Sequence, residues 1–171
     1  TRSHEELEAV RVQAQRESAT GPANGLLATR SATATKSDVA IMDTPASVAV
    51  VTQQQIESLA TRTVGEALLY VPGVAVEFDG VDSRFDTMSL RGFNADSVAW
   101  LDGVKLAGGS GAGNNWTLPQ IDPFMLERIE VLKGPASVVY GQVVPGGMVN
   151  MVSKRPTQTD QRNIELTLGA P

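Results

Sequence analysis

The stretch LERIEVLKGPASV, residues 126–138, specifies three local structures in succession. Residues 129–132 are apolar apart from one glutamate, which favours a strand. Gly134 and Pro135 then predict a turn, and residues 136–140 predict a short helical segment. A strand is therefore followed at once by a reversal of the chain.

The sequence around this stretch alternates strands with short helices. Asp122 and Pro123 predict a short helix through Arg128, because proline is favoured at the first helical position. Asp102 and Gly103 predict a tight turn, the strongest short hairpin signal in the chain. The other expected strands cover residues 47–51, 74–78, 87–90, 98–101, 104–106 and 148–153.

Two capping patterns predict helices in the first half of the chain. Thr52 followed by Gln55 is a capping box that opens a helix, and Thr63 with Glu66 repeats the pattern. Ile56 and Leu59 are expected to face inward from the first helix, and the second helix carries Val64, Leu68 and Leu69. Strands and helices interleaved in this way predict an α+β fold with a small mixed sheet of about four strands.

The composition excludes several classes of protein. With 171 residues, 42% of them hydrophobic, the chain can bury one ordinary core. Its net charge of −5 argues against nucleic-acid binding, which usually needs a basic face. There is no cysteine, and the one histidine is His4, which removes disulfides, thiolate metal sites and most catalytic triads. We expect no enzyme, no protein metal site and no covalently bound cofactor.

The two ends of the chain differ from the region between them. About the first 40 residues look extended and mobile, with order beginning near Thr44 and Pro45. Residues 7–14 are an exception, because alternating apolar and polar residues make them competent to form a strand; the alternative is a solvated tail. Residues 164–168 also alternate, with nothing after them to pair. We therefore expect the chain to be cut from a larger protein.

Several short phrases follow one another in a fixed order, and together they are far more specific than any one alone. They are TPASV and VVT (44–52), YVPGV (70–74), LRGF (90–93), LDGV (101–104), LERIEVLKGPASV (126–138), YG (140–141), PGG (145–147) and NMVSKRP (150–156). The series closely resembles the plug domain of TonB-dependent outer-membrane receptors, particularly the ferric-siderophore receptors. The resemblance runs from about Ala28 to Pro156.

The resemblance implies transport across the outer membrane of a Gram-negative bacterium. In such receptors a ferric siderophore binds at the extracellular face, and the siderophore holds the iron, not the protein. TonB supplies the energy from the inner membrane. The implied division is a flexible segment with a TonB box at residues 1–40, the plug at 41–160, and the start of a barrel strand at 161–171. The missing C-terminal barrel would have 22 strands around a plugged lumen.

The same resemblance implies that residues 7–14, the segment near the N-terminus that can form a strand, bind TonB. An exposed flexible strand can add to a partner's sheet through backbone hydrogen bonds, with little demand on side chains. Arg11 and Gln13 stand where TonB boxes often have Thr or Ser. The residues expected to bind the C-terminal domain of TonB are Leu7, Glu8, Ala9, Val10, Arg11, Val12, Gln13 and Ala14.

Three loops, residues 79–84, 94–97 and 108–116, are the expected siderophore-binding apices. Trp116 stands where hydroxamate receptors of the family carry an aromatic residue; its alternative role is packing on the barrel wall. Asp79 stands where those receptors have an arginine, and Arg84 is the candidate to replace it. The residues expected to contact the siderophore are Arg84, Asn94, Ser97, Gly109, Asn115 and Trp116.

Arg91 and Lys133 match the basic plug positions that meet glutamates of the barrel in this family. The alternative for each is a solvated surface charge. Two other functions stay open beside siderophore import: a plug for another ligand such as cobalamin or a carbohydrate, and a free-standing periplasmic ligand-binding module.

Overall fold

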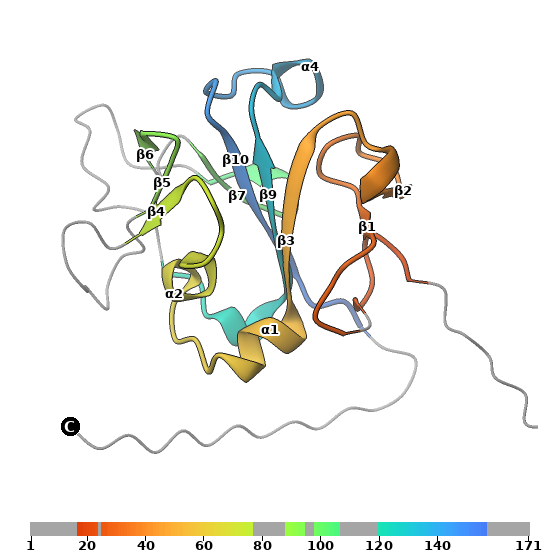
Figure 1. Cartoon of the computed structure of the whole chain (residues 1–171), viewed down its shortest axis with the longest axis vertical. Coiled ribbons are helices and arrows are strands. Elements are labelled where there is room, and N and C mark those ends of the chain that lie inside the picture. The colour runs from red at the N-terminus through yellow and green to blue at the C-terminus, as the bar shows by residue number, and fades with distance from the viewer. Residues whose placement is uncertain (1–16, 24, 77–87, 95–97, 107–119, 157–171) are drawn as a thin grey trace, which may run out of the picture.

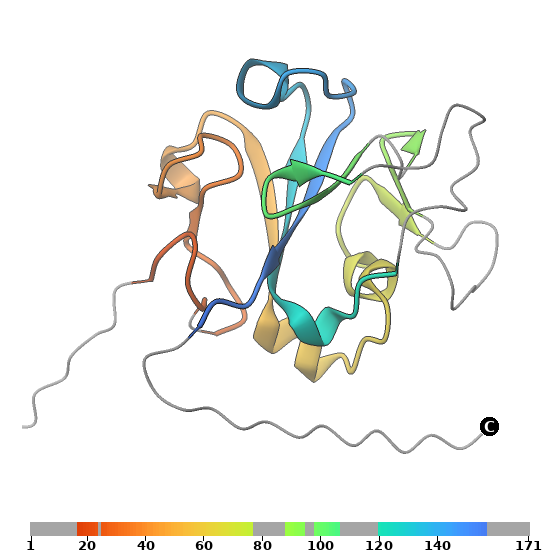
Figure 2. The same cartoon turned by 180° about the vertical axis from the view of Figure 1, so that it is seen from behind.

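The computed structural model describes residues 17–23, 25–76, 88–94, 98–106 and 120–156. A mixed sheet in the order β3-β9-β10-β7-β8 forms the centre (Figures 1 and 2). Its strands are β3 (Ser47–Thr52), β7 (Ala99–Leu101), β8 (Val104–Lys105), β9 (Leu126–Lys133) and β10 (Gly147–Ser153). β9 is antiparallel to β3 and β10, whereas β10 and β7 are parallel. The predicted α+β fold with a small mixed sheet is confirmed, with five strands rather than about four.

One face of this sheet carries the apolar core. Ile129, Val131, Val149 and Met151 alternate along β9 and β10 and are at most 2% exposed. They share one cluster with residues of two helices and a second, three-stranded sheet. These elements are α1 (Gln53–Ser58), α2 (Val64–Leu68), β4 (Val74–Val76), β5 (Met88–Leu90) and β6 (Phe93–Asn94).

The predicted caps hold both helices. The Thr52 hydroxyl accepts from the Gln55 N–H, and the Gln55 side chain accepts from the Thr52 N–H, so this capping box is confirmed. At α2 the Thr63 hydroxyl accepts from the Glu66 N–H, but the Glu66 carboxylate accepts from the N–H of Arg62 instead. In the second pattern the Thr63 cap is therefore present, and the Glu66 carboxylate bonds to the N–H of the residue before it, Arg62.

Of the two side chains predicted to face inward from the first helix, Ile56 is buried, whereas Leu59 is 48% exposed, so the prediction is wrong for Leu59. In the second helix Val64 and Leu68 are buried and Leu69 is 52% exposed. Leu59 and Leu69 are the C-cap residues of their helices, where the chain leaves the helical path.

The predicted helix through Arg128 is wrong beyond its first turn. Asp122 caps a short 3₁₀ helix, η2 (Pro123–Met125), through the Phe124 N–H, and β9 begins at the next residue. Arg128 pairs with β3 on one side and β10 on the other. Neighbours on both sides satisfy the backbone here, so a strand replaces the helix. The helical segment after the turn is confirmed as α4 (Ser137–Tyr140).

Residues 17–23 and 25–43 lie against the second face of the sheet, and we call this segment the strap (Figure 1). It contains the antiparallel pair β1 (Arg30–Ser31) and β2 (Val39–Ala40), followed by η1 (Ile41–Asp43). Ala19, Ser31 and Thr33 are at most 2% exposed. The expectation that order begins near Thr44 is therefore wrong, because earlier residues have partners on the sheet.

The strands predicted at residues 7–14 and 164–168 lie outside the described residues. Within the residues that are described, no helix has both the length and the apolar character needed to cross a membrane.

Candidate functional site

Arg128 and Glu130 place two buried charges on the sheet face beneath the strap. Both belong to β9, on either side of Ile129, and are 0% and 1% exposed. Arg128 Nη1 lies 3.7 Å from Glu130 Oε1. Removing two charges from water is costly, and the mutual attraction offsets this cost only where further hydrogen bonds satisfy the groups. The strap supplies hydrogen bonds to both groups, whereas Arg128 Nε and Glu130 Oε1 have no hydrogen-bond partner among the described residues.

The Arg128 guanidinium donates to three backbone carbonyls of the strap. Its Nη2 donates to the carbonyls of Ser18, at 2.8 Å, and Gly21. Its Nη1 donates to the carbonyl of Arg30 at 3.3 Å. The planar fork of a guanidinium can serve several acceptors at once. One side chain therefore ties two separate parts of the strap to the central strand.

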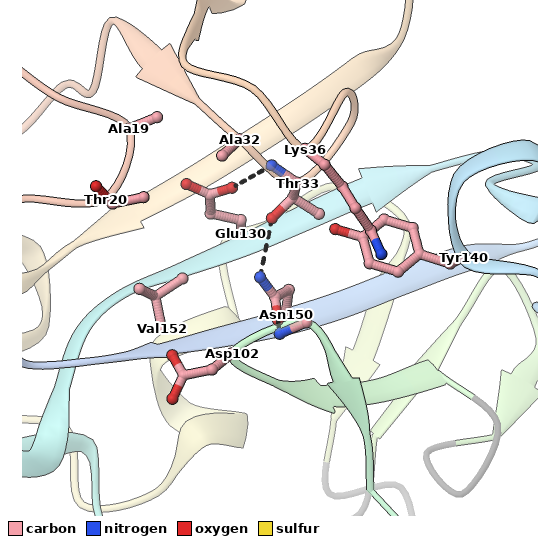
Figure 3. Close-up of a pocket in the computed structure, with 11 residues that line it drawn as sticks. Ala19, Thr20, Ala32, Thr33, Lys36, Asp102, Glu130, Tyr140, Asn150 and Val152 are labelled. Carbon is pink, nitrogen blue, oxygen red and sulfur yellow. Dashed lines mark hydrogen bonds between the residues drawn. The ribbon is translucent and has the colours of Figure 1, made fainter.

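Glu130 and Asn150 continue this network (Figure 3). Glu130 Oε2 accepts from Ser31 Oγ at 2.6 Å and from the Thr33 N–H at 3.2 Å. Asn150 Nδ2 donates to Thr33 Oγ1 at 3.0 Å, and its Oδ1 accepts from the Gly103 N–H at 2.9 Å. The network therefore joins the strap to β9, to β10 and to the turn between β7 and β8.

A cavity of about 210 Å³ lies between the strap and the sheet, beside this network. Thr33, Lys36, Glu130, Tyr140 and Asn150 are among its lining residues, and Figure 3 shows them converging from the strap, β9, β10 and α4. Lys36 Nζ lies 4.5 Å from the centre of the Tyr140 ring. Burial raises the pKa of the Tyr140 hydroxyl, a hydrogen bond with Thr33 opposes this, and the Glu130 charge adds to it. The cavity is lined by several polar side chains, although most of its lining surface is apolar, and the strap borders it on one side.

Glu127 is a third buried charge of β9, at 7% exposure. Its Oε1 has no hydrogen-bond partner among the described residues. Burial raises the pKa of this carboxyl group, the charges of Arg128 and Lys154 oppose the rise, and that of Glu57 adds to it.

Arg91 and Lys133, the predicted barrel contacts, lie at one end of the molecule. Arg91 follows β5 with a φ of 52°, and its N–H donates to the Gly73 carbonyl at 2.9 Å. A Cβ at Gly134, the residue after Lys133, would lie 3.9 Å from Arg91 Nη1. Lys133 is half-buried and Arg91 exposed. Among the described residues, no ion pair involves either of these two cations.

Three of the phrases quoted from the sequence meet at this same end. The Gly134 N–H donates to the Gly146 carbonyl at 3.0 Å. A Cβ at Gly146 would lie 2.5 Å from the Phe93 ring and 2.6 Å from the Leu90 carbonyl oxygen, which leaves room for glycine alone. The KGP, PGG and LRGF phrases are therefore in contact, and together they position Arg91 and Lys133.

The predicted ligand and TonB contacts fall almost entirely outside the described residues. Asn94 is the exception for its backbone, which pairs with Ser89 in the β5–β6 register. Outside the described residues lie Arg84, Ser97, Gly109, Asn115, Trp116 and residues 7–14. The described residues contain no group of three or more His, Cys, Asp or Glu that could hold a metal ion.

Sequence reasoning missed Arg128 and Glu130. They alternate with Ile129 and Val131, which indicates a strand with one polar face. Charged residues on such a face are usually solvated, and no local pattern shows that the strap covers them. Their partners lie 97 to 110 positions away in the chain.

Comparison with known proteins gives a consistent result. Residues 40–148 match the family model of the TonB-dependent Receptor Plug Domain. The chain is 45% identical over 150 residues to the ferrioxamine receptor of Yersinia enterocolitica, covering 86% of this chain and 21% of that protein. It is 42% identical over 159 residues to the ferrichrome outer membrane transporter and phage receptor of Escherichia coli, covering 91% and 21%.

Solved structures show the same likeness. The pyoverdine outer membrane receptor FpvA of Pseudomonas aeruginosa aligns with a TM-score of 0.63 and 27% identity, over 77% of this chain and 19% of that one. The alcaligin receptor FauA of Bordetella pertussis aligns with a TM-score of 0.61 and 27% identity, over 78% and 23%. The chain thus spans about a fifth of the length of its curated relatives.

Proposed function

Because the chain belongs to the TonB-dependent receptor plug domains, we propose that it is the plug of an outer-membrane receptor that imports ferric siderophores. The observation that carries the proposal is the identity of 45% and 42% to receptors named for ferrioxamine and ferrichrome. These relatives are a receptor and a transporter, not enzymes. The proposed role is gating and ligand sensing, with the iron held by the siderophore and no cofactor bound by the plug.

The proposed TonB contact is the segment from Leu7 to Ala14. An outer membrane has neither ATP nor a usable potential, so energy must arrive through a protein that reaches from the inner membrane. A strand added to TonB can transmit a pull along the backbone without specific side chains. The segment from Leu7 to Ala14 belongs to the proposed N-terminal segment at 1–40, and the plug is proposed at 41–160. The strap lies almost entirely before these plug bounds and covers one face of the central sheet.

The proposed ligand contacts are the apices that carry Arg84, Asn94, Ser97, Gly109, Asn115 and Trp116. A tryptophan offers a broad rigid face and one N–H donor, which suits a partly apolar chelate. We keep the hydroxamate class as the proposed ligand, because ferrioxamine and ferrichrome name the relatives at 45% and 42% identity.

Arg91 and Lys133 are proposed to seat the plug against glutamates of a surrounding barrel. Their proximity at one end, without an ion pair among the described residues, supports this role. A charge buried at such an interface strongly favours a partner of opposite sign. The barrel itself is proposed to follow from residue 161.

The test is a proline substitution in the full-length receptor. Val10→Pro removes one backbone N–H and fixes the local backbone, so added-strand pairing with TonB is lost. We expect siderophore binding to be kept and uptake to be abolished. Val10→Thr, which keeps the N–H, is the matched control and is expected to transport. Normal uptake by Val10→Pro would contradict the TonB assignment.

A further inference from the structure

We infer that Phe93 is a positioning residue for the proposed siderophore site. Its ring packs against Gly146, and this contact fixes the backbone at Asn94, the first residue of the second proposed ligand apex. The inference rests on the proposed function and deepens it, because it names a residue that sets ligand affinity through the backbone that follows it.

The hairpin formed by β5 and β6 has an unusual turn just before Phe93. Leu90 and Phe93 pair across two turn residues, Arg91 and Gly92, whose φ angles are 52° and 84°. Two successive positive φ angles are typical of a type I′ turn, whose first position favours Asn, Asp or Gly. An arginine in the left-handed region is strained. The turn therefore depends on support from other segments of the chain.

That support comes from glycines in two other segments. A Cβ at Gly146 would lie 2.5 Å from the Phe93 ring and 2.6 Å from the Leu90 carbonyl oxygen, so only glycine lets the hairpin approach this closely. The Arg91 N–H donates to the Gly73 carbonyl at 2.9 Å. The hairpin is thus held against the residue before β10 and against the residue before β4, and the Phe93 ring makes the first of these contacts.

The beginning of β10 fixes the chain on both sides of the proposed apex. On one side, Phe93 packs against Gly146, the residue before β10. On the other side, β7 begins at Ala99, which pairs with Val149 of β10. From Asn94 to Ala99 an extended chain would reach at most about 18 Å, so the apex stays close to the start of β10. A shift of the Phe93 end therefore shifts the backbone of the apex.

The exposure of Phe93 suits a positioning role. Phe93 is 37% exposed, whereas its partner across the turn, Leu90, is fully buried in the core. A smaller side chain at position 93 therefore leaves the core intact but loosens the hairpin against Gly146. Hydrogen bonds weaken steeply when their geometry is disturbed, so a loosened support lowers ligand affinity.

Ligand titration of the full receptor tests the inference, with ferrichrome and ferrioxamine as the ligands. Phe93→Leu removes the ring, and we expect the Kd of the bound chelate to rise about tenfold or more, with the number of binding sites per receptor unchanged. Phe93→Tyr keeps the ring and is expected to bind like wild type. Phe124→Leu is the matched control, because Phe124 is 44% exposed and lies on η2, at the other end of β9. It is expected to leave the Kd unchanged.

The number of sites separates positioning from a merely structural role. Loss of stability lowers the number of competent receptors but leaves the Kd of the remaining ones unchanged. Fewer sites with a wild-type Kd in Phe93→Leu would therefore show that Phe93 only stabilises the fold, and would overturn the inference.

A double-mutant cycle tests whether Phe93 acts through the apex. In a receptor that already carries Asn94→Ala, we expect Phe93→Leu to raise the Kd by less than about threefold, because coupled residues are not additive. Full additivity of the two substitutions, or a wild-type Kd for Asn94→Ala alone, would overturn the inference.

The wild-type receptor separates failure of this inference from failure of the proposed function. If it binds neither chelate nor any other ferric siderophore, the proposed function is contradicted. If it binds one of them and Phe93→Leu binds that chelate equally well, only the role of Phe93 is overturned.

Discussion

Asn150 lies directly opposite Glu130 in the β9–β10 register, and both side chains bond to Thr33 of the strap. The carboxylate takes the Thr33 N–H, while the amide donates to the Thr33 hydroxyl. Two neighbouring strands thus bond to the backbone and to the side chain of one residue, Thr33. This fixes the position of the strap along the sheet.

Thr33→Val tests how much the hydrogen bond between Thr33 and Asn150 contributes to the free energy of unfolding. The variant keeps the shape and the backbone bond to Glu130 but leaves the buried Asn150 amide without its acceptor. An unsatisfied buried polar group costs about 1–3 kcal/mol, and we expect a loss of that size in the free energy of unfolding. Urea denaturation measures it, with the exposed Thr20→Val as the control. A loss no larger than that of the control would contradict the prediction.

Two glycines are expected to respond very differently to alanine. Gly103 has a φ of 78°, but the nearest atom to an added Cβ is 4.0 Å away, on Tyr140, so Gly103→Ala costs only backbone strain of about 1 kcal/mol. Gly147 also has a positive φ, and its Cβ would overlap the Leu132 carbonyl. We expect Gly147→Ala to cost more than about 4 kcal/mol. Similar unfolding midpoints for the two variants would refute this difference.

From the burial of Glu127 we expect a specific dependence of stability on pH. Burial raises its folded-state pKa above the ordinary value of 4.5, so the folded chain favours the protonated form. The resulting stability is fully present below pH 4.5 and is lost as the pH rises through the folded-state pKa. Glu127→Gln resembles the protonated form and is expected to be more stable than wild type at pH 7, with the difference vanishing near pH 4. A pH-independent difference in thermal midpoint would contradict this.

Arg91→Glu distinguishes an interface charge from a solvated one. In the 171-residue chain we expect a change within about 0.5 kcal/mol, because Arg91 is exposed and makes no ion pair among the described residues. In the full receptor the reversed charge would face the proposed barrel glutamates, and we expect uptake to fall at least tenfold. Arg62→Glu is the control and is expected to transport normally. Equal uptake by both variants would identify Arg91 as a solvated charge.

Local signals in the sequence predicted the elements whose partners are close in the chain. Thr52 and Gln55 bond to each other three residues apart, and the Asp102–Gly103 turn joins adjacent strands as expected. Such features depend on a few neighbouring residues, so a single sequence contains the whole interaction.

The failures occurred where distant residues decide the structure. Arg128 reads as the end of a helix, yet strands on both sides of it impose an extended backbone. The strap reads as a tail, because Ser31 and Thr33 have no apolar pattern, and their partner Glu130 lies about a hundred positions away. The family resemblance identified Arg91 and Lys133 as candidates, but it gave no indication that Arg128 and Glu130 bond to the strap.

Uptake of radioactive iron tests the central claim most directly. The full-length gene that contains this chain would be expressed in a Gram-negative strain without receptors for ferrioxamine or ferrichrome, with and without TonB. We predict that iron from at least one of these chelates accumulates in the cells when TonB is present, and only binds at the surface when TonB is absent. No accumulation from any ferric siderophore, or equal accumulation in both strains, would contradict the account.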